Sequence, residues 1–101
     1  MEIILDDRRY VPSNSRYNVA RTYEDCIDYI RVFGKVDFIS LDYDLGEEKT
    51  GFDVLVYMAE NGIRVKHINI HSDHSVGVPK MREYAWKHFP DVSLTFNPLN
   101  F

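Results

Sequence analysis

Three short apolar segments of the sequence each end in side chains that could bind a metal ion, bind phosphate or move a proton. These side chains are Asp6 and Asp7, then Asp42 and Asp44, then His71 and Ser72. Carboxylates that lie close together raise one another's pKa unless a cation compensates their charge, and oxygen ligands suit Mg²⁺ or Mn²⁺. An imidazole changes charge near neutral pH, so His71 could act as a general acid or base. The alternative interpretation is that each acidic pair only caps a turn.

Alternating strands and helices must position these side chains. Strands are predicted at residues 2–5, 17–20, 36–42, 65–70 and 92–96, and helices at residues 22–33, 52–61 and 79–89. This alternation predicts one α/β domain over residues 1–101, with a mainly parallel five-stranded sheet covered on both faces. Ligands of such sheets bind outside the carboxyl ends of the strands, so the acidic pairs and His71-Ser72 are expected to converge at one edge.

Local signals set the predicted ends of the helices. Thr22 and Asp25 resemble a capping box at the start of the first helix. Gly34 and Gly62 stand where the first two helices are expected to stop. Pro79 is typical of a first helical turn, so the third helix is predicted to start near it.

The stretch just before the third helix could bind an anion. Ser72, Gly77 and the backbone between them could form a turn at the amino end of this helix, where free amides favour negative charge. Lys80 and Arg82 add positive charge in the first turns of the helix. His74 lies within the turn, and it could be a second proton donor, a metal ligand or a solvated loop residue.

The composition narrows the class of protein. Twelve Lys and Arg against sixteen Asp and Glu give a net charge of −4, which argues against binding nucleic acid through a broad basic surface. The single cysteine, Cys26, cannot form an internal disulfide, so a reducing compartment is expected. No apolar run approaches the roughly 18 residues of a membrane span, and no signal-peptide pattern is present. We expect a small, soluble, cytoplasmic domain that does not bind membranes.

The middle of the chain resembles response-regulator receiver domains. The run Asp42-Tyr43-Asp44-Leu45-Gly46, followed by Gly51-Phe52-Asp53, matches the strand end with the phospho-accepting Asp and the Gly that opens the next helix. Asp6-Asp7 matches the receiver acidic pair, and Ser72 stands where receivers keep Ser or Thr. Asn97 replaces the receiver Lys, and so removes the charge that pairs with the phosphoryl group.

This resemblance implies a small three-layer, flavodoxin-like α/β domain whose first and last helices are reduced or missing. The loop from Arg8 to Tyr17 stands where receivers have their first helix, and no fifth helix follows Asn97-Pro98.

A narrower resemblance accounts for these departures. The sequence is similar to the cyclic-phosphate processing receiver-like family at three motifs: Leu5-Asp6-Asp7-Arg8-Arg9, Leu41-Asp42-Tyr43-Asp44-Leu45-Gly46, and His71-Ser72-Asp73-His74-Ser75-Val76-Gly77. The third motif departs from the family pattern, with His74 for Asn and Ser75 for Pro. The resemblance implies a metal-dependent phosphoesterase-like activity on cyclic phosphates of nucleotides or RNA ends.

Taken together, the residues and the resemblance predict a site of three parts. The catalytic residues are His71, Asp42 and Ser72; the phosphate-binding residues are Arg9, Ser72, Gly77 and His74; and the ligands of Mg²⁺ or Mn²⁺ are Asp6, Asp7, Asp42 and Asp44. Asp42 could bind metal, act as a nucleophile, or do both. The expected partner is a phosphorylated small molecule or a nucleic-acid end. Whether the protein forms a homodimer is left open by the sequence.

Two other functions remain open at this point. The first is a signalling receiver that a kinase phosphorylates on Asp42. The second is a non-catalytic module that binds cyclic nucleotides or a protein partner.

Overall fold

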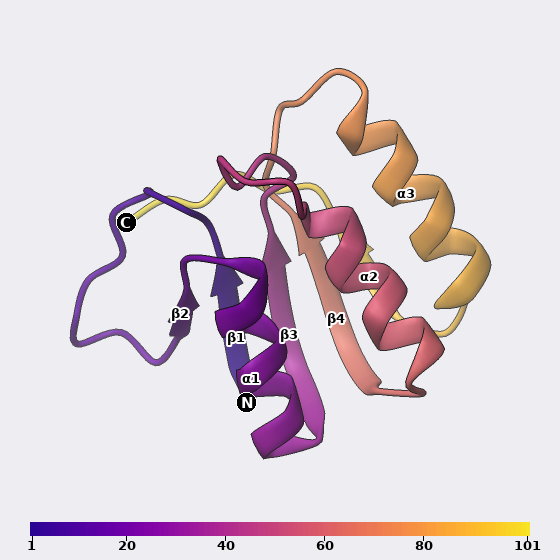
Figure 1. Ribbon diagram of the computed structural model, residues 1–101, viewed down its shortest axis with the longest axis horizontal. Coiled ribbons are helices and arrows are strands. Elements are labelled where there is room, and N and C mark those ends of the chain that lie inside the picture. The colour runs from indigo at the N-terminus through magenta and orange to yellow at the C-terminus, as the bar shows by residue number, and fades with distance from the viewer.

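The computed structural model describes residues 1–101, and helices and strands alternate along the chain after the first two strands (Figure 1). The elements are β1 (Glu2–Leu5), β2 (Asn18–Ala20), α1 (Tyr23–Phe33), β3 (Lys35–Leu41), α2 (Gly51–Glu60), β4 (Arg64–Ile70), α3 (Gly77–His88) and β5 (Ser93–Thr95). The five strands form one sheet in the order β2-β1-β3-β4-β5, and every neighbouring pair is parallel. This topology confirms the predicted flavodoxin-like α/β fold.

All three helices pack on one face of the sheet. Ile3, Ile39 and Ile68 are paired in register on β1, β3 and β4. All three are fully buried in one core cluster with Ile30 of α1 and Leu55 of α2. Met81 of α3 joins the same cluster. Because side chains on a strand alternate between its two faces, this core lies on a single side of the sheet. The helices therefore hold the central strands in place from that side.

The opposite face is covered by the loop after β1 and by the segment that follows β5, instead of by helices. The C-terminal segment runs across the sheet toward this loop (Figure 1). Arg9 Nη1 donates a hydrogen bond to the carbonyl of Leu99 at 2.9 Å, and the rings of Tyr17 and Phe101 lie 6.1 Å apart. Coverage of both faces was predicted, and the absence of the first and last helices explains why loops provide it here.

Most of the predicted helix ends are confirmed. Thr22 accepts a hydrogen bond from the backbone N–H of Asp25, and Gly34 ends α1 with a φ of 75°. Gly62, which follows α2, has a φ of 60°. Helix α3 begins at Gly77, earlier than the predicted start near Pro79, because the backbone N–H of Val78 already bonds to the carbonyl of His74. No helix combines the length and the apolar character that a membrane span requires.

Candidate functional site

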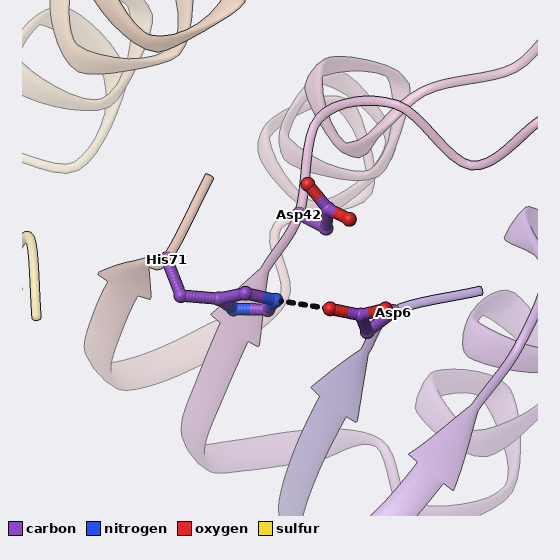
Figure 2. Close-up of side chains that lie close together, drawn as sticks. All are labelled: Asp6, Asp42 and His71. Carbon is purple, nitrogen blue, oxygen red and sulfur yellow. Dashed lines mark hydrogen bonds and ion pairs between the residues drawn. The ribbon is translucent and has the colours of Figure 1, made fainter. Parts of the chain in front are cut away.

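Asp6, Asp42 and His71 meet at the carboxyl ends of three adjacent strands (Figure 2). The last residues of β1, β3 and β4 are paired in register, so the residue that follows each strand emerges at the same edge. One ligand atom from each of the three side chains lies within 4.8 Å of the other two. The fold thus brings together two predicted metal ligands and the predicted proton-transfer residue, which are distant in sequence.

His71 is the most enclosed member of this group. Its side chain is only 1% exposed, and both ring nitrogens are engaged. Nε2 lies 2.9 Å from Asp6 Oδ2, and Nδ1 lies 2.7 Å from Ser40 Oγ. Burial lowers the pKa of His71, although the charges of Asp6 and Asp42 act in the opposite direction. Both ring nitrogens of His71 are therefore occupied by protein partners, and Asp6 is the carboxylate that the ring contacts.

Asp6 is held as an ionised acceptor. Burial acts to raise its pKa, but the backbone N–H groups of Arg8 and Arg9 and the His71 ring outweigh burial and leave the pKa lowered. The two N–H groups donate to Asp6 Oδ1 at 3.0 and 2.9 Å. Arg21 braces the same turn, because its Nη1 donates to the carbonyls of Asp6 and Arg9. The turn therefore presents a fixed carboxylate.

Asp42 is the more accessible carboxylate, and its pKa is raised. Burial is the main cause and the negative charge of Asp6 is the second, although His71, Ser72 and the N–H of Tyr43 lower the pKa. Its Oδ1 accepts a hydrogen bond from the backbone N–H of Tyr43 at 2.8 Å. A raised carboxylate pKa brings the group closer to the pH at which it can exchange protons.

These side chains line a cavity of about 450 Å³ at the edge of the sheet. Its lining is polar or charged except for Pro98, and comprises Asp6, Arg8, Arg9, Asp42, His71, Ser72, Asp73 and Pro98. Arg9 Nε lies 3.7 Å from Asp6 Oδ2, so its guanidinium is anchored beside the carboxylates. The cavity therefore combines negative and positive groups, as a site for a metal ion and a phosphate requires.

Two of the predicted metal ligands do not belong to this group. Asp44 is exposed, and its Oδ1 accepts a hydrogen bond from the backbone N–H of Gly46 at 2.9 Å. Asp7 lies against the same turn, since a Cβ on Gly46 would come within 3.2 Å of Asp7 Oδ2. Asp44 thus caps the turn after β3, as in the alternative interpretation that an acidic residue caps a turn, and Asp7 lies beside that turn.

Comparison with known families identifies the family of this chain. A family model described as the cyclic-phosphate processing receiver domain matches residues 1–87. The chain belongs to this family. Neither the comparison with curated proteins nor the comparison with solved structures gives a match. The matched residues of the receiver domain include all three members of the site and end before β5.

His74 and Gly77, predicted to bind phosphate, lie at the amino end of α3 in this receiver domain. His74 Nδ1 accepts hydrogen bonds from the backbone N–H groups of Gly77 at 2.9 Å and Val76 at 3.3 Å. A Cβ on Gly77 would come within 2.2 Å of the Tyr43 ring, so a glycine is needed there. Neither His74 nor Gly77 lines the cavity, whereas Arg9 and Ser72 both do.

Sequence reasoning missed Ser40 and Asn69, which support the receiver domain's site from within the sheet. Both are buried, with 0% and 3% of their surface exposed, and they bond to each other at 2.9 Å. A signal was present, because each is a polar residue between two apolar residues at the end of a central strand. Each also shares the face of its strand with the site residue two positions later, Asp42 or His71.

The donor set fits a hard divalent cation. Asp6 and Asp42 offer carboxylate oxygens, and each carboxylate has about four acceptor positions, so both keep capacity beyond their present hydrogen bonds. Burial, and after it the negative charge of Asp6, raise the pKa of Asp42, and a cation bound between the two carboxylates would oppose both effects. His71 offers no free nitrogen. Two carboxylates with room for water and phosphate fit the way proteins hold Mg²⁺ or Mn²⁺.

Proposed function

We propose that this receiver domain is a metal-assisted phosphoesterase that opens cyclic phosphates of nucleotides or RNA ends. The observation that carries the proposal is the pair of unlike carboxylates: Asp6, ionised and fixed by His71, beside Asp42, whose pKa is raised. An ionised carboxylate suits binding a cation, whereas a carboxylate with a raised pKa suits exchanging protons, so the two residues are suited to different roles. The family's name supports cyclic phosphates as the substrate class.

Asp6 and Asp42 are the residues that would hold Mg²⁺ or Mn²⁺. When bound, such an ion would polarise a phosphoryl oxygen and make a coordinated water more acidic. Arg8 and Arg9, on the same cavity, would contact the phosphate oxygens, since a guanidinium matches their geometry.

Asp42 is assigned the proton transfer in this reaction. A water oxygen forms a new bond to phosphorus, and one P–O bond of the ring breaks. Asp42 takes the proton of the water and returns it to the leaving alkoxide, so that a phosphomonoester forms and one water is consumed. Ser72 lines the cavity beside Asp42 and would orient a phosphoryl oxygen. His71 takes part through Asp6, which its Nε2–H keeps in place.

The test is turnover of 2′,3′-cyclic nucleotides with Mg²⁺ or Mn²⁺, followed by ³¹P NMR of the monoester product. We expect Asp42→Asn to reduce kcat by about 10²–10⁴-fold, the usual loss for a general acid–base residue. Asp44→Asn is the matched control, because the same change falls on a neighbouring acid outside the site group, and it should keep wild-type activity. No turnover by the folded wild type, or an equal loss in both variants, contradicts the proposal.

The same samples separate the two other functions. Stable phosphorylation of Asp42 by acetyl phosphate, detected by mass spectrometry without monoester formation, would favour a signalling receiver. Calorimetry that shows tight binding of the cyclic nucleotide without product would favour a binding module.

A further inference from the structure

A continuous chain of hydrogen bonds crosses the sheet from β5 to Asp6. His67 Nε2 lies 2.8 Å from Thr95 Oγ1, which donates to Asn69 Oδ1 at 2.6 Å. Asn69 Nδ2 donates to Ser40 Oγ at 2.9 Å, and the chain continues from Ser40 through His71 to Asp6. No buried polar side-chain atom is left without a hydrogen-bond partner. Every buried donor and acceptor of this hydrogen-bond chain is therefore satisfied.

The backbone of Asn97 fixes the direction of this chain. Its N–H donates to Asn69 Oδ1 at 2.9 Å, and its carbonyl accepts from Asn69 Nδ2 at 2.9 Å. A backbone N–H can only donate and a carbonyl can only accept, so the Asn69 amide has one orientation. The amide must then present N–H to Ser40, and the Ser40 hydroxyl keeps its hydrogen for His71.

The other end of the chain requires the same direction. Asp6 accepts two backbone N–H groups on Oδ1, and its Oδ2 faces His71 Nε2, so the ring must donate there. A ring with hydrogen on Nε2 presents a bare Nδ1, which can accept the Ser40 hydroxyl. Both ends therefore select one tautomer of His71.

We propose that Ser40 and Asn69 are positioning residues, which hold His71 in the tautomer with hydrogen on Nε2 and so fix Asp6 for the reaction. This inference rests on the proposed function only for its effect on turnover. It also assigns a role to the segment after the third helix, because the backbone of Asn97, which orients the Asn69 amide, lies beyond the residues 1–87 that the family model matches.

The experiment locates the hydrogens of the His71 ring by long-range ¹H–¹⁵N NMR in the wild type and three variants. Wild type should show hydrogen on Nε2 and none on Nδ1. Asn69→Asp replaces the donor to Ser40 by an acceptor, so Ser40 should donate to the new carboxylate and hydrogen should appear on Nδ1, while Nε2 keeps its hydrogen toward Asp6. Thr95→Val is the matched control, because Asn97 still orients Asn69, and its spectrum should match wild type.

Ser40→Ala removes only the hydroxyl that lies between Asn69 and His71. It should shift the Nδ1 resonance of His71 and lower kcat by about 10–100-fold with KM unchanged, the usual loss for a residue that orients a ligand of the site. Hydrogen on Nδ1 in the wild type, or a bare Nδ1 in folded Asn69→Asp, would overturn the inference. If Asn69→Asp does not fold, an unshifted Nδ1 resonance in Ser40→Ala overturns it. Absence of turnover in the wild type refutes the proposed function, while the spectra still decide the direction of the chain.

Discussion

At the scale of single residues, Gly51 decides how closely helix α2 approaches the site. A Cβ at this position would come within 2.0 Å of the carbonyl oxygen of Asp42 and 3.4 Å of Met81 Sδ. The backbone N–H of Gly51 also bonds to the carbonyl of Tyr43 at 3.0 Å. The missing side chain therefore lets the start of α2 press against the backbone that carries Asp42.

We expect Gly51→Ala to destabilise the fold by about 1–3 kcal/mol, the usual cost of overpacking, and to displace Asp42. Chemical denaturation measures the first effect, and the rise in Tm on adding Mn²⁺ measures the second. Gly34→Ala is the control, because its positive φ causes strain while no atom lies within 4 Å of its Cβ. That variant should lose stability but keep the Mn²⁺ response; loss of the response in both would show that the close approach is unimportant.

The sequence allowed the charged members of the site to be predicted, but not their supports. Asp6, Asp42 and His71 follow apolar runs, and a parallel sheet must bring such positions to one edge. The bond from Ser40 to His71 depends on which residues of neighbouring strands face each other, and the register is not visible in one sequence.

At the scale of elements, the start of helix α3 depends on a side chain that was expected to bind phosphate. His74 Nδ1 accepts the backbone N–H groups of Val76 and Gly77, which the helix cannot satisfy internally. The ring also lies against Tyr43, with centroids 4.6 Å apart. The family pattern to which the sequence is similar has Asn here, and Asn is itself a good helix cap.

His74→Ala should therefore destabilise the fold by about 0.5–2 kcal/mol and leave KM for the cyclic phosphate unchanged. His74→Asn should recover most of that stability, since its amide oxygen can accept the same N–H groups. Urea denaturation and steady-state kinetics on the three proteins test this assignment. A rise in KM for His74→Ala without loss of stability would instead support a phosphate contact.

The elements were more predictable than the contacts between them. Thr22, Gly34 and Gly62 marked helix ends correctly, because capping is a local property of the chain. The start of α3 was placed too late, since the His74 ring gives a cap that no standard residue pattern announces. For the second face of the sheet, the sequence predicted only that the first and last helices are reduced or missing. It did not predict that the loop after β1 and the C-terminal segment lie there together.

At the scale of the whole molecule, the site imposes a cost on folding when no cation is bound. The folded-state pKa of Asp42 is raised by burial and by Asp6, so the folded protein binds the Asp42 proton more tightly than the unfolded chain. Stability therefore falls as the pH rises from the ordinary value of 3.8 through the raised pKa, and the deficit persists at neutral pH.

Asp42→Asn should accordingly raise the Tm of metal-free protein at pH 7, by roughly 4–8 °C for each kcal/mol of relieved destabilisation in a domain of this size. The gain should disappear below a pH of about 3.8, where the wild-type carboxyl is protonated in both states. Thermal denaturation in EDTA across this range is the measurement. Added Mn²⁺ should reverse the order of the two proteins at pH 7 by binding only the wild type. A gain that does not depend on pH would contradict this electrostatic origin.

The all-parallel sheet has a consequence for folding kinetics. Every strand pair is parallel and requires a crossover connection, so none of the pairs can form as a local hairpin. The entropy cost of closing a long loop must therefore be met before the contacts of each pair form. The bond from His71 to Asp6 closes a separation of 65 residues across three strands. The chain should consequently fold more slowly than a helical bundle of its length. Its ion-binding capacity should be recovered only with the last phase of refolding, so stopped-flow Mn²⁺ uptake would time the completion of the sheet.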